Sequence, residues 1–145
     1  MIKLLAMVVV LASAQNAATP AGAPAVFEPR QISENAMKFV AANDMKGLFE
    51  LIARHMPLAP EELEKIRVKM VEQRKAIPGA LGKSLGYAFI SECRKSDFLV
   101  RYLFVEKREK NVMRWQFIFY KPRTTWQMTN FYWDEDTNSL FLPCS

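Results

Sequence analysis

The sequence has few of the residues from which metal and redox centres are built. Its 145 residues include one histidine, His55, and two cysteines, Cys93 and Cys144. A single imidazole excludes any site that needs two histidine ligands, and two thiols exclude a four-thiolate zinc cage. The cysteines do not form a C-x-x-C pair, which argues against thiol–disulfide redox catalysis. We therefore expect no metal site and no cofactor.

Long apolar runs are also scarce. The longest, from Leu4 to Ala12, would rise only about 14 Å as a helix, whereas the hydrocarbon core of a bilayer is about 30 Å thick. Lys3 precedes this run, and Ala12-Ser13-Ala14 supplies the small residues of a cleavage site. We expect residues 1–14 to be a secretory signal peptide rather than a buried strand or helix. The protein would then be periplasmic or secreted, with no transmembrane anchor.

The rest of the composition is that of an ordinary globular protein. Half of the residues are apolar, 24% are charged, and the net charge is +5. Residues 15–29 are rich in Ala and Pro and have no apolar period, so they are expected to be a flexible lead-in. Residues 30–145 are long enough for one domain with its own core. Because the protein is expected to be exported, nucleic acid is not an expected partner despite the basic balance.

Export also determines how the two cysteines are interpreted. In an oxidising compartment, Cys93 and Cys144 are expected to form a disulfide. Closing the loop of about 50 residues between them would stabilise the fold by about 4 kcal/mol in the chain-entropy model. The alternative is a pair of free thiols, one buried and one at the C-terminus.

The first half of the domain has helical periodicity. Apolar residues recur at steps of three and four up to about His55, interrupted at Asn43-Asp44, and again after Pro60. The pattern predicts two or three helices. In the last one, Arg74 and Lys75 lie where the helix dipole favours cations, and Ile77-Pro78-Gly79 ends the helix. The expected buried positions are Ile32, Ala36, Met37, Val40, Leu48, Leu51, Ile52, Leu63, Ile66, Met70 and Ile77.

The second half has the period of strands. Aromatic and β-branched residues alternate with polar ones over about 84–94, 97–107, 112–121 and 125–133, and the short turns between them predict a four-stranded antiparallel meander. Hairpins centred at Lys95-Ser96 and Glu109-Lys110 would place one aromatic face across three strands. The expected pairs are Tyr87 with Phe104, Phe89 with Tyr102, Phe104 with Trp115, Tyr102 with Phe117 and Val100 with Phe119.

Each sheet face has an expected role. The helices should cover the aromatic face, and a cavity left there would be a ligand pocket lined by Tyr87, Phe89, Tyr102, Trp115 and Phe117. The outer face mixes apolar and polar residues, with Glu92 and Arg101 as diagonal neighbours. Such a face is a candidate surface for a homodimer, the alternative being a partly covered face in a monomer. Its candidate interface residues are Ile90, Leu99, Arg101, Leu103 and Ile118.

Four stretches together resemble a known family. Phe39-Val40 followed by Asn43-Asp44 and Leu48–Leu51 is similar to that family's opening helix pair, and Gly82–Gly86 to its approach to the first long strand. The segments 115–122 and 126–131 are similar to its last hairpin. The family is the nuclear-transport-factor-like (cystatin-like) α+β superfamily, including small exported members. The resemblance implies helices packed on a curved four-stranded sheet. Its members include isomerase-like enzymes, ligand-binding modules and association domains, so the fold alone does not decide the function.

Three functions remain open from the sequence. The first is a non-catalytic exported module that associates with itself or with an envelope protein. The second is a carrier of a small apolar ligand, and the third a ketosteroid-isomerase-like enzyme. The enzyme would need an acidic base in the pocket, and we expect no Asp or Glu at an inward position of the first three strands. Two charged segments are expected to be a solvated basic hairpin tip and an acidic turn rather than a calcium loop: 107–110 and 134–138.

Overall fold

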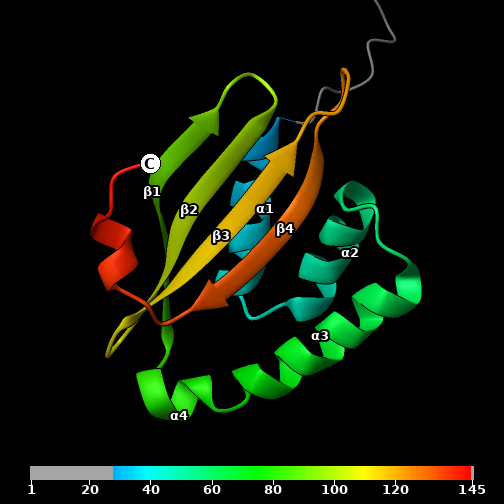
Figure 1. The fold of residues 1–145 in the computed structure, drawn as a ribbon. Coiled ribbons are helices and arrows are strands. Elements are labelled where there is room, and N and C mark those ends of the chain that lie inside the picture. The colour runs from blue at the N-terminus through cyan, green and yellow to red at the C-terminus, as the bar shows by residue number, and fades with distance from the viewer. Residues whose placement is uncertain (1–27, 145) are drawn as a thin grey trace, which may run out of the picture.

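The computed structural model describes residues 28–144, and it has the expected α+β architecture (Figure 1). The predicted signal peptide and nearly all of the predicted lead-in lie outside the described residues. Helices come first and strands follow, with no exchange between the two halves of the chain. The helices are α1 (Pro29–Ala41), α2 (Met45–His55), α3 (Pro60–Arg74) and the short α4 (Ile77–Leu81). The strands are β1 (Ser84–Lys95), β2 (Leu99–Arg108), β3 (Val112–Tyr120) and β4 (Gln127–Asp134).

The first two helices form as the periodicity predicts. Helix α1 begins at Pro29, slightly earlier than expected, because proline has no N–H to lose at the first helical position. The chain turns at Asn43, whose φ is +54°, and the side chain of Asp44 then accepts a hydrogen bond from Gly47 N at 2.8 Å, which caps α2. The predicted apolar positions of both helices are buried.

Helix α3 departs from the prediction. Leu63 and Met70 are buried as expected, but Ile66 is exposed, because α3 is polar on most of its circumference and only a narrow stripe faces the protein. Arg74 is buried rather than placed at a solvated helix end. The helix stops there, and Ile77 begins α4 instead of extending the stripe of α3.

The four strands form one antiparallel sheet in the order β1-β2-β3-β4. The expected register between β2 and β3 is confirmed, with Phe104 opposite Trp115 and Tyr102 opposite Phe117. The expected register between β1 and β2 is wrong, since Phe89 lies opposite Phe104 and Tyr87 opposite Glu106.

Two local features cause this error. The first hairpin turns through three residues, Ser96 to Phe98, rather than at Lys95-Ser96, and Ser96 adopts a φ of +63°. A β-bulge then inserts Ile90 as an extra residue between the pairs Phe89–Phe104 and Ser91–Leu103. A bulge places two residues opposite one and shifts every later pair of the strand.

The core lies between the helices and the predicted aromatic face of the sheet. Helix α1 packs against β1 and β2, and α2 packs against β4, so the helices cover one face only (Figure 1). The core side chains of this face are completely buried or nearly so, as predicted, and they include Tyr102, Phe104, Trp115, Phe117 and Phe119.

The C-terminal segment is attached to the opposite, outer face. After β4 the chain forms a 3-10 turn, η1 (Asn138–Phe141), and then reaches β1. Cys93 and Cys144 form a disulfide with Cα atoms 5.5 Å apart, which resolves the choice between a disulfide and free thiols. Within residues 28–144, no helix has the length and apolar character needed to cross a membrane.

Candidate functional site

The five residues predicted to line an inner pocket lie on one face, but they are divided between core and edge. Tyr102, Trp115 and Phe117 are buried in the core, while Tyr87 and Phe89 lie on β1 and are partly exposed. Phe89 packs edge-to-face on Phe104, and the guanidinium of Arg30 lies 3.5 Å from the Phe89 ring centroid. Neither of the two hollows described below is lined by any of these five residues.

Tyr102 has a polar environment at the margin of this core. Arg94 Nη2 donates a hydrogen bond to the Tyr102 hydroxyl at 3.4 Å, and Glu92 lies opposite Tyr102 in the sheet. Burial of the phenol raises the pKa of Tyr102, and the negative charge of Glu92 raises it further. The hydroxyl is therefore protonated at neutral pH and satisfied by Arg94.

A buried carboxylate lies on the aromatic face, where none was predicted. Glu106 occupies an inward position of β2 and is completely buried. Arg74 Nη1 and Nη2 each donate to one oxygen of Glu106 at 3.1 Å, and Arg108 Nη2 donates at 2.8 Å. Arg108 Nη1 also donates to Gly82 O at 2.7 Å, and Arg74 Nε donates to Asn43 Oδ1 at 3.3 Å. We name Glu106, Arg74 and Arg108 the buried ion cluster.

The expectation of no inward acid is therefore wrong, and the sequence did contain the signal. Glu106 follows Tyr102 and Phe104 at a spacing of two, so the alternation that placed both rings inward also placed Glu106 inward. Arg108 was expected to lie in a solvated basic hairpin tip, and this is wrong. Arg108 is buried, because the same alternation places it inward. Because the cluster holds two cations and one anion, both oxygens of the Glu106 carboxylate are engaged by guanidinium groups.

The candidate interface residues are all on the outer face or at its edge, but they are not equally accessible. Leu103 is only 7% exposed, whereas Ile90 is 39% exposed, and Leu99, Arg101 and Ile118 are intermediate. Cys93 is on this face too, opposite Arg101. The disulfide therefore holds the end of the chain against this face.

The predicted neighbours Glu92 and Arg101 lie on opposite faces, which corrects the sequence prediction. The bulge at Ile90 inverts the alternation of the following β1 residues, so that Glu92 lies opposite Tyr102. Glu92 accepts instead from Arg94, two residues away on the same strand. Arg101 is left on the outer face.

The acidic segment 134–138 forms a turn at the end of β4. Arg114 Nε donates to Asp134 at 2.9 Å, and Asp136 accepts from Asn138 N at 3.1 Å. The hydrogen bond from Arg114 is the main reason that the pKa of Asp134 is lowered. Hydrogen bonds from Ser139 are the main reason that the pKa of Asp136 is lowered. Both carboxylates are thus ionised and engaged within the protein.

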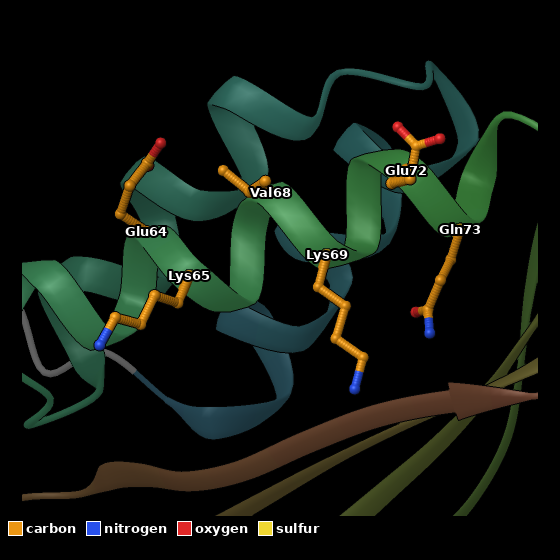
Figure 2. A pocket seen from close by; sticks show the side chains of 6 residues that line it. All are labelled: Glu64, Lys65, Val68, Lys69, Glu72 and Gln73. Atoms are coloured by element: carbon orange, nitrogen blue, oxygen red, sulfur yellow. The ribbon is translucent and has the colours of Figure 1, made fainter.

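One of the two hollows runs along α3 (Figure 2). Its lining comes from two adjacent rows of that helix: Glu64, Val68 and Glu72 in one, and Lys65, Lys69 and Gln73 in the other. Since a single helix supplies all six residues, this is an open helix surface rather than an enclosed site. The charged residues of both signs around Val68 are those of a solvated helix face.

The other hollow is a groove between three elements. It is lined by α1, the end of α2 with the following Met56 and Pro57, and the connection from β3 to β4, and its volume is about 970 Å³. We name it the α1–α2 groove, and its lining residues are Gln31, Ile32, Asn35, Leu51, Ala53, Arg54, His55, Met56, Pro57, Thr124, Thr125, Trp126 and Gln127.

Comparisons with known proteins give no match from which a function could be assigned. No protein-family model matches the chain, and neither a curated protein nor a solved structure matches it. Within the described part, no three His, Cys, Asp or Glu side chains are grouped so that they could hold a metal ion.

Proposed function

We propose that this protein is an exported, non-catalytic association module that forms a homodimer through the outer face of its sheet. The observation that carries the proposal is the concentration of exposed apolar side chains on that face and at its edges. Ile90, Phe98, Tyr120 and Tyr132 each expose more than a third of their surface there. Exposed apolar side chains gathered on one face are typical of protein–protein contacts.

The C-terminal segment adds to this surface. Phe141 and Leu142 precede Cys144, and Phe141 is 87% exposed. Exposed aromatic side chains are common anchors in protein–protein interfaces, and the disulfide holds this segment near β1. A second copy is the simplest partner because a two-fold axis presents the same patch from both sides.

The interior favours association over the two alternatives. The space that an apolar ligand would occupy is filled by rings such as Trp115 and Phe117. The inward carboxylate of Glu106 is neutralised by guanidinium groups rather than placed beside an open pocket. Export is supported by the disulfide, which is typical of oxidising compartments. The arrangement of helices on one face of a four-stranded meander supports membership of the nuclear-transport-factor-like superfamily.

Sedimentation equilibrium of the oxidised, processed chain tests the proposal. We expect a reversible dimer, and Ile90→Arg should weaken association by about a hundredfold because each protomer would then place a cation in the apolar contact. The control is Val68→Arg, which adds the same charge at a 55% exposed apolar position on α3 and should leave association unchanged. A monomer across the concentration range, or equal effects of both substitutions, would disprove self-association through this face.

A further inference from the structure

We propose that the α1–α2 groove binds a small organic anion with an apolar body. The groove has the size of a ligand site, since its volume of about 970 Å³ lies within the range of roughly 300–1,000 Å³ in which small molecules are bound. It lies between helices α1 and α2 and the β3–β4 connection, and none of its lining residues is among those assigned to the outer-face contact, so this inference does not rest on self-association.

The base of the groove is apolar. Ile32, Leu51 and Met56 line it and are also members of the hydrophobic core, each less than a tenth exposed. Trp126 forms part of the wall and packs against the same core while remaining partly exposed. The indole offers a flat apolar surface against which a ring or short chain can lie.

The charged residues that line the groove are all cationic. None of the thirteen lining residues is Asp or Glu, and Arg54 is an exposed cation at the end of α2. Among residues 28–144, Arg54 has no carboxylate within salt-bridge distance. Lys121 Nζ lies 5.0 Å from the centroid of Trp126, which adds a second cation beside the wall. A negatively charged ligand group is the chemical complement of these two side chains.

His55 lies next to Arg54 in the lining and acts as a neutral polar group. Burial lowers the pKa of His55, and the positive charge of Arg54 lowers it further. Near neutral pH the imidazole is therefore uncharged and adds no charge to that of Arg54. The amides of Gln31, Asn35 and Gln127 complete a polar rim, so the groove combines an apolar floor, a polar rim and one sign of charge.

Nuclear magnetic resonance titration with 2-naphthoate and its neutral analogue 2-naphthamide tests this inference. His55 is the only histidine, so its imidazole signal reports from the groove without ambiguity, and the indole N–H of Trp126 is a second reporter. We expect saturable shifts of both signals with 2-naphthoate at pH 7, and binding of 2-naphthamide that is weaker by about tenfold.

Matched arginine variants identify the source of the charge. Arg54→Gln should weaken 2-naphthoate binding about tenfold and leave 2-naphthamide unchanged. Arg67→Gln, on α3 and paired with Glu64, is the control and should not alter either affinity. Unfolding curves check that each variant remains folded. Equal binding of the acid and the amide, shifts that avoid both reporters, or no saturable shift would each overturn the inference.

Discussion

At the scale of single residues, the buried ion cluster is the most consequential feature of the core. Glu106, Arg74 and Arg108 are all buried, and Arg74 connects the sheet to α3 and, through Asn43, to the turn between α1 and α2. Desolvating three charges is costly, and it is compensated only while every partner is present. Removing one charge should therefore have a larger effect than removing any solvated ion pair.

We predict that Glu106→Gln lowers the free energy of unfolding by about 3–5 kcal/mol, because it leaves two buried guanidinium groups without an anion. Urea unfolding followed by circular dichroism measures this difference. The matched control is Glu92→Gln, whose partner Arg94 is partly solvated and whose loss should cost less than about 1 kcal/mol. Similar losses in both variants would show that the cluster does not stabilise the fold.

At the scale of elements, helix α4 and strand β1 meet at a glycine that the backbone requires. Gly82 has φ +79° and ψ −166°, a conformation that is nearly restricted to glycine. A Cβ atom there would also lie 2.4 Å from Glu109 Oε2, the oxygen that accepts from Lys83 N. This position therefore fixes how the chain leaves the helices and enters the sheet.

We predict that Gly82→Ala lowers the free energy of unfolding by about 2 kcal/mol, from backbone strain and displacement of Glu109. Gly79→Ala is the control, because Gly79 lies within α4 and a Cβ atom there meets nothing within 4 Å. That substitution should be neutral or stabilising by up to about 1 kcal/mol. Thermal unfolding compares the two variants, and an equally tolerated Gly82→Ala would contradict the assignment.

The elements also show how far sequence patterns determine this fold. Strand alternation was sufficient for the β2–β3 register, because those strands pair without interruption. It failed in β1, because the three-residue turn from Ser96 to Phe98 and the bulge at Ile90 both shift the pairing, and neither contains a glycine or proline that would mark it in the sequence. Glu106 was missed for a different reason: the alternation placed it inward, but its partner Arg74 comes from a helix distant in sequence, so the strand pattern alone did not show how a buried carboxylate is compensated. The α1–α2 groove likewise combines three segments that share no motif.

At the scale of the whole molecule, the disulfide links the first strand of the sheet to the C-terminal segment. Cys93 in β1 and Cys144 are 51 residues apart in sequence, so the bond encloses β2, β3 and β4 in one covalent loop. Constraining a loop of this length in the unfolded chain is worth about 4 kcal/mol in the chain-entropy model.

We predict that the double variant Cys93→Ala/Cys144→Ala is about 4 kcal/mol less stable than the oxidised protein in urea unfolding. Wild-type protein unfolded under reducing conditions should match the variant, which controls for the loss of the sulfur atoms themselves. If the variant kept the stability of the oxidised chain, the bond would have no role in holding the fold.

The interruptions of β1 have a consequence for solubility. This twelve-residue strand lies at the margin of the sheet, and a long regular margin could recruit strands from other chains into fibrillar aggregates. Register shifts near Gly86 and at Ile90 divide it into segments of four and five regular pairs. Each break twists the margin out of line, so that continuous growth by strand addition has no template. The protein can thus expose apolar side chains on the outer face of its sheet while the β1 edge offers no regular template for strand addition.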